Sequence, residues 1–91
     1  MPNIDIRRLH HLSVPEARAV VDRVAAGMQA RFGMTGQWQD NAFRFSRSGA
    51  KGTITVGEDD VHVLVELGFL LSAMKGMIDQ EIRQKLDEHF G

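Results

Sequence analysis

The chain has 91 residues, 43% hydrophobic and 25% charged, which is the composition of one ordinary globular domain spanning residues 1–91. Its 11 basic and 12 acidic residues give a formal net charge of -1 and leave no positive surplus for duplex binding, so we expect no nucleic-acid partner. The absence of cysteine excludes disulfides, thiolate zinc sites and thiol nucleophiles.

The N-terminus and the most apolar window are compatible with a cytoplasmic protein. The first dozen residues carry charges and lack the apolar run of a secretory signal. Residues 68–78 form the most apolar window, but they include a lysine and two glycines and fall short of the roughly 20 apolar residues that span a bilayer. We therefore expect a cytoplasmic location and no membrane span.

The opening segment predicts a strand followed by a helix. Ile4 and Ile6 alternate with polar residues, the period of a strand with one covered face. Ser13 and Glu16 have the spacing of a capping box, which predicts a helix start, and Gly33 is the expected left-handed C-terminal cap. Between them, apolar residues recur at steps of three and four and define one core-facing stripe: Ala17, Val20, Val21, Val24, Met28 and Phe32.

Residues 34–67 change to short runs separated by turn residues, a pattern typical of hairpins. The predicted strands are residues 36–39, 42–48, 53–56 and 61–67. The predicted turns are residues 40–41, 49–52 and 57–60. Three successive hairpins of this kind predict an antiparallel meander.

The period is helical again from Phe69 to Phe90. One apolar series runs at steps of four: Leu70, Met74, Ile78, Ile82, Leu86 and Phe90. A second series, Phe69, Ala73 and Met77, widens the stripe over the first two turns. The order of elements predicts an α+β fold in which an antiparallel sheet of four to five strands carries both helices on one face. The sheet face without helices is then either exposed to solvent or covered by a second copy of the chain.

Polar residues at predicted core-side positions are the candidates for a ligand site. Arg8 and His10 share the parity of the isoleucines in the first strand, and Arg47 shares that of the neighbouring phenylalanines. Because buried charge is costly unless paired and guanidinium groups bind carboxylates bidentately, these three residues are a candidate anion or carboxylate site. The alternative is that the strands leave the core here and the side chains reach water or pair with helix carboxylates.

We expect no catalytic group, metal or cofactor. His10 and His11 are adjacent in an extended segment and point to opposite faces, so they cannot bind one ion. Residues 49–53 resemble a phosphate-binding loop only loosely, because a strand follows them and not a helix. Residues 58–60 form an acidic turn, and no pair of carboxylates stands out as an acid–base couple. These patterns favour a protein that is not an enzyme.

Phe69, Leu70, Leu71 and Met77 crowd the start of the second predicted helix. They either complete the core or leave an exposed apolar patch. Such a patch would be a candidate interaction site for a dimer partner or an apolar surface.

Three segments together resemble a known family: residues 4–10 (IDIRRLH), 45–53 (FSRSGAKGT) and 67–75 (LGFLLSAMK). The chain is similar over essentially its whole length to bacterial polyhydroxyalkanoic acid system, or granule-region, proteins. The resemblance implies a role in polyhydroxyalkanoate storage and carries no catalytic residue. It leads us to expect a granule-associated binding or regulatory module in the cytoplasm or at the granule surface. Its partner would be the granule or another granule-system protein.

Two other functions are compatible with the same residues. The chain is alternatively a domain that binds a small carboxylate, hydroxy acid or lipid-like molecule through Arg8, His10 and Arg47. It is otherwise a homodimeric interaction protein that uses the free sheet face or an edge strand.

Overall fold

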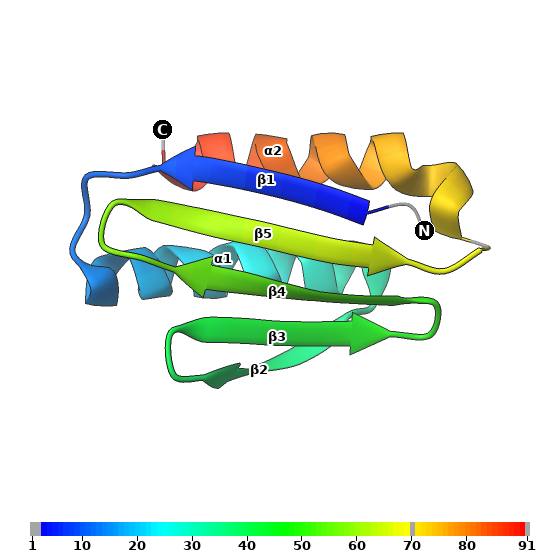
Figure 1. Cartoon of the computed structure of the whole chain (residues 1–91), viewed down its shortest axis with the longest axis horizontal. Helices are drawn as coiled ribbons and strands as arrows, with labels where there is room; N and C mark the ends of the chain where they lie inside the picture. Colours follow the sequence, from blue (N-terminus) through cyan, green and yellow to red (C-terminus); the bar gives the residue numbers. More distant parts are fainter. Residues whose placement is uncertain (1–2, 70, 91) are drawn as a thin grey trace.

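The computed structural model describes residues 3–69 and 71–90 as a five-stranded antiparallel sheet with both helices on one face (Figure 1). The elements are β1 (Asn3–Leu9), α1 (Val14–Phe32), β2 (Thr35–Gln39), β3 (Ala42–Arg47), β4 (Ala50–Val56), β5 (Asp60–Leu67), the 3-10 helix η1 (Leu71–Met74) and α2 (Lys75–Phe90). The strand order β1-β5-β4-β3-β2 places the first strand beside the last. The predicted fold class and element order are confirmed.

Helix α1 begins and ends where the sequence predicts. The Ser13 hydroxyl accepts a hydrogen bond from the Glu16 N–H at 3.3 Å, and the Glu16 carboxylate accepts one from the Ser13 N–H at 3.3 Å. This reciprocal pair is a capping box. At the other end Gly33 takes φ 70°, and its N–H donates to the Gln29 carbonyl oxygen at 2.8 Å. Local chemistry therefore sets both helix boundaries.

The second and third hairpin turns are shorter than predicted, the third because β5 already begins at Asp60. Asp40, at φ 55°, and Asn41 form the expected two-residue turn between β2 and β3. The next turn is shorter than predicted, because β4 already begins at Ala50 after Gly49 adopts φ 86°. As a result, Gly52 lies inside β4 rather than in the turn.

The second helix starts later than the prediction of Phe69. Helix α2 begins at Lys75 and is preceded by η1. The Gly68 N–H donates to the Gly49 carbonyl oxygen at 2.6 Å, and the Ser72 hydroxyl donates to the Phe69 carbonyl oxygen at 2.7 Å. These bonds fix a turn between β5 and η1. Phe69 therefore lies in that turn and not on the helix.

The core lies between the sheet and the two helices. Strand β5, in the sheet interior, contributes Val61, Val63, Val65 and Leu67, all at most 1% exposed. Helix α2 contributes Ile78, Ile82 and Leu86, as predicted. Figure 1 shows α1 and α2 behind the sheet, and no described element covers the front. In the described ranges no helix has the length and apolar character needed to cross a membrane.

Candidate binding surfaces

The three predicted ligand residues lie at two different ends of the sheet. Arg47 pairs with Ala50 at the start of β4. Arg8 pairs with Val61 of β5, and Val61 pairs in turn with Val56 at the end of β4, so these residues form one row across the sheet. The two rows are six residue steps apart, from Ala50 to Val56, which is about 20 Å along a strand. The structure does not bring Arg8 and Arg47 into one anion site.

Both arginines have partners in the helices instead. Arg8 forms an ion pair with Asp87 of α2. Arg47 donates from Nη1 to the carbonyl oxygen of Phe32, the last residue of α1, at 2.7 Å. The Arg8–Asp87 pair corresponds to the alternative interpretation, in which a charge at a strand end pairs with a helix carboxylate. Arg47 differs from it, because its partner is a main-chain carbonyl.

His10 is the one buried polar side chain among the described residues, with 5% exposure. Its Nδ1 accepts a hydrogen bond from the Leu12 N–H at 3.1 Å, so the proton must be on Nε2, which donates to the Gly57 carbonyl oxygen at 3.0 Å. The ring also lies 5.8 Å from that of Phe90, between centroids. Both nitrogens are engaged. His10 therefore joins the β1–α1 connection to the β4–β5 turn.

Three of the residues at the start of the second helical segment are exposed. Phe69 is 92% exposed and Met77 is 45% exposed. Ala73, from the same predicted series, is exposed as well. Phe69 lies in the β5–η1 turn, Ala73 in η1 and Met77 in the first turn of α2, and we call these three exposed residues the apolar patch. An aromatic side chain that folding leaves this open contributes almost nothing to the core, which makes it available for an interaction.

Of the other two residues of that predicted surface, one is half-buried and the other lies outside the described residues. Leu71 is half-buried and packs against the core, with its Cδ1 3.4 Å from where a Cβ on Gly49 would lie. It anchors η1 to the β3–β4 turn. Leu70 lies outside the described residues.

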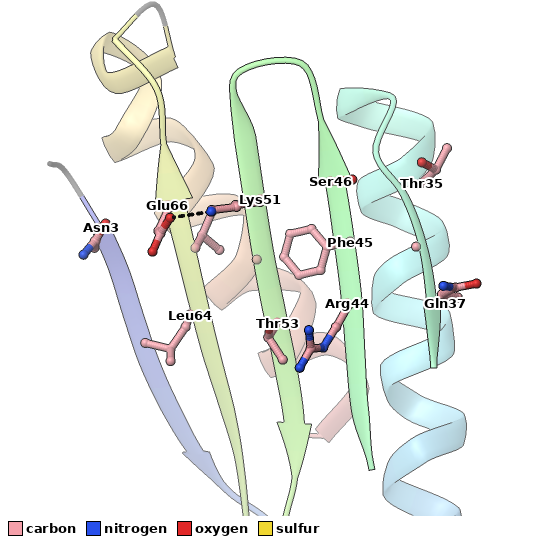
Figure 2. A pocket seen from close by; sticks show the side chains of 13 residues that line it. Asn3, Thr35, Gln37, Arg44, Phe45, Ser46, Lys51, Thr53, Leu64 and Glu66 are labelled. Carbon is pink, nitrogen blue, oxygen red and sulfur yellow. Dashed lines mark ion pairs between the residues drawn. The ribbon is translucent and has the colours of Figure 1, made fainter. Parts of the chain in front are cut away.

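The open face of the sheet contains a groove of about 810 Å³ that the sequence does not predict (Figure 2). Residues from all five strands line it. Lys51 and Glu66 form an ion pair across it at 3.4 Å. Arg44 also lines it and has no ion-pair partner among residues 3–69 and 71–90. The alternation of Arg44 with Phe43 and Phe45 is visible in the sequence, but its neighbours across the sheet are not.

The cavity between the sheet and α1 is much smaller. Its volume is about 50 Å³, and its lining is mostly apolar, including Met28, Met34, Phe45 and Ile82. Small-molecule sites have volumes of about 300–1,000 Å³. This interior space therefore cannot hold an acyl chain without rearrangement of the core.

Titratable side chains on the open face form pairs between β1 and β5. His62 Nε2 lies 2.6 Å from Asp5 Oδ1, and Arg7 Nε lies 3.4 Å from Asp60 Oδ2. In the part of the chain that the structure describes, no three His, Asp or Glu side chains gather to hold a metal. The pairs instead connect the edge strand β1 to the sheet, each with a contribution of about 0.2–1 kcal/mol.

A model of a known family matches residues 4–90. The description of that family is "putative polyhydroxyalkanoic acid system protein". Neither a curated protein nor a solved structure matches the chain. The matched range includes both the apolar patch and almost all of the groove lining.

Proposed function

Because the chain belongs to this polyhydroxyalkanoic acid system family, we propose that it is a non-enzymatic module that binds the surface of polyhydroxyalkanoate granules through the apolar patch. The observation that carries the proposal is the 92% exposure of Phe69. The patch offers apolar side chains to a polyester surface that is itself apolar.

The chemistry of the patch suits a disordered polymer surface better than a shaped pocket. Full burial of a Phe or Met side chain is worth about 1.5–3 kcal/mol, so partial burial of both gives weak and reversible association. Methionine adapts to irregular surfaces through its flexible thioether. Such binding fits a protein that samples granules from solution.

The polar side chains support a binding role over a catalytic one. His10 has both nitrogens engaged in main-chain hydrogen bonds. Arg8 and Arg47 are occupied by Asp87 and Phe32. The interior cavity, at about 50 Å³, is too small for an acyl substrate.

Sedimentation with protein-free particles of amorphous poly(3-hydroxybutyrate) tests the proposal. We expect wild-type protein to sediment with the particles, and the Phe69→Gln/Met77→Gln variant to bind at least about tenfold more weakly. Leu9→Gln is the matched control, because Leu9 is 71% exposed but lies at the opposite end of β1 from the patch. All three proteins should have the same melting temperature, since the replaced side chains are exposed.

Wild-type protein that stays in the supernatant would overturn the proposal. Equal sedimentation of the folded double variant would do the same. Light scattering tests whether a second copy of the chain occupies the patch instead. If the wild-type protein is a dimer that does not bind particles, and the double variant is a monomer, the patch is a dimer interface.

A further inference from the structure

We infer that the groove on the open sheet face binds a short oligomer of a hydroxy acid, with Arg44 holding its terminal carboxylate. The ligand class rests on the proposed function. The site itself rests on the groove, which is separate from the apolar patch and has a different chemistry.

The size and position of the groove suit a small ligand. Its volume of about 810 Å³ lies within the usual range of small-molecule sites, about 300–1,000 Å³. Both helices lie on the other side of the sheet, so a ligand would reach the groove without any movement of the core (Figure 1).

The charges of the groove select a carboxylate. Lys51 and Glu66 neutralise each other at 3.4 Å, which leaves the positive charge of Arg44 uncompensated among the described residues. Figure 2 shows the Arg44 guanidinium extending from β3 toward Thr53 of β4, inside the groove. A guanidinium presents parallel N–H donors that match the two oxygens of a carboxylate.

The uncharged lining suits an ester chain. Hydroxyl and amide groups that can donate hydrogen bonds also line the groove: Asn3, Thr35, Gln37, Ser46 and Thr53. A polyester chain has many carbonyl acceptors and no donor except its terminal hydroxyl. A donor-rich groove therefore complements the ester carbonyls.

Leu64 supplies an apolar contact at a defined distance from Arg44. It is 45% exposed on the open face of the sheet. Thr53 pairs with Arg44 on one side and with Leu64 on the other, so the three side chains form one row across the sheet. Two strand spacings separate Arg44 from Leu64, about 10 Å. A ligand with a carboxylate at one end and aliphatic carbons further along would contact both.

A titration of isotopically labelled full-length protein with the linear trimer of 3-hydroxybutyric acid, followed by NMR, tests the inference. We expect saturable shifts of backbone amides in β3, β4 and β5 around Arg44, Thr53 and Leu64. Arg44→Gln should weaken binding at least about tenfold, the loss expected for a charge-assisted hydrogen bond. The trimer methyl ester should bind wild-type protein more weakly than the free acid.

Arg23→Gln is the matched control, because Arg23 is an exposed arginine on α1, away from the open face. It should bind the trimer like wild type. The inference is overturned if the trimer causes no saturable shifts, if Arg44→Gln binds it equally well, or if the shifts are confined to the apolar patch. Butyrate binding as tightly as the trimer would overturn the ligand class.

The two proposals fail separately. Arg44→Gln should still sediment with polyester particles, because the apolar patch is intact. The Phe69→Gln/Met77→Gln variant should still bind the trimer. Wild-type protein that sediments with the particles but does not bind the trimer would reject the groove ligand alone. Wild-type protein that binds the trimer but does not sediment would reject granule docking alone.

Discussion

The guanidinium of Arg47 donates a hydrogen bond to the main-chain carbonyl oxygen of Phe32 across 2.7 Å, joining the end of β3 to the end of α1. The last carbonyls of a helix lack intrahelical partners and carry a partial negative charge, which a cation stabilises. A residue that looks like an anion ligand in the sequence is thus a helix cap in the structure.

Replacing Arg47 with Ala should lower the free energy of unfolding by about 1 kcal/mol, because the Phe32 carbonyl loses a charged donor that is partly exposed. Urea denaturation measures the change. Arg47→Lys should keep part of the stability, since the ammonium retains the charge at the helix end. An Arg47→Ala variant as stable as wild type would contradict the capping role.

Replacing His10 with Phe should lower the free energy of unfolding by about 2 kcal/mol, because a phenyl ring makes neither of the two hydrogen bonds of the imidazole. The Leu12 N–H and the Gly57 carbonyl would lose their partners beneath a side chain that is 5% exposed. Thermal and urea unfolding measure the loss. In the wild-type protein, long-range ¹⁵N–¹H NMR should show the proton on Nε2. A proton on Nδ1 would contradict the network.

Replacing Gly52 with Ala should destabilise the fold by more than about 2 kcal/mol, because the new methyl would overpack the sheet. Its Cβ would lie 2.5 Å from the Phe45 ring and 2.7 Å from the Leu64 carbonyl oxygen. Gly76→Ala is the control, since a Cβ there meets nothing within 4 Å. That helical substitution should instead add about 0.4–1 kcal/mol. Equal melting temperatures for the two variants would contradict the packing at Gly52.

Mild peroxide treatment should oxidise Met77 before the methionines of the core. Met77 is 45% exposed, whereas Met28 and Met34 are 5% and 3% exposed. Oxidation to the sulfoxide follows access to the thioether sulfur. Peptide mass spectrometry gives the order. Faster oxidation of Met28 or Met34 would mean that the core opens more readily than the structure implies.

Local signals predict most of the fold. The Ser13–Glu16 capping box and Gly33 set the bounds of α1 because both act within a few residues of the chain. The alternation of apolar and polar residues that begins at Ile4 and Ile6 likewise predicts correctly that His10 is buried. Such features need no knowledge of the rest of the molecule.

The candidate sites depend on contacts between distant parts of the chain, which the sequence pattern does not contain. Arg8 and Arg47 have the expected parity, but the pairing of β1 with β5 sets their rows at opposite ends of the sheet. Phe69 continues a helical period, yet the bond between Gly68 and Gly49 keeps it in a turn. The groove around Arg44 likewise exists only once five strands are side by side.

Oxidative footprinting of the wild-type protein on polyester particles tests granule docking most directly. Hydroxyl radicals label exposed side chains, and mass spectrometry compares bound with free protein. Our account predicts that Phe69 and Met77 become protected on the particles, while Leu9, 71% exposed at the other end of β1, stays as reactive as in solution. Bound protein in which Phe69 and Met77 react as fast as in free protein would contradict it.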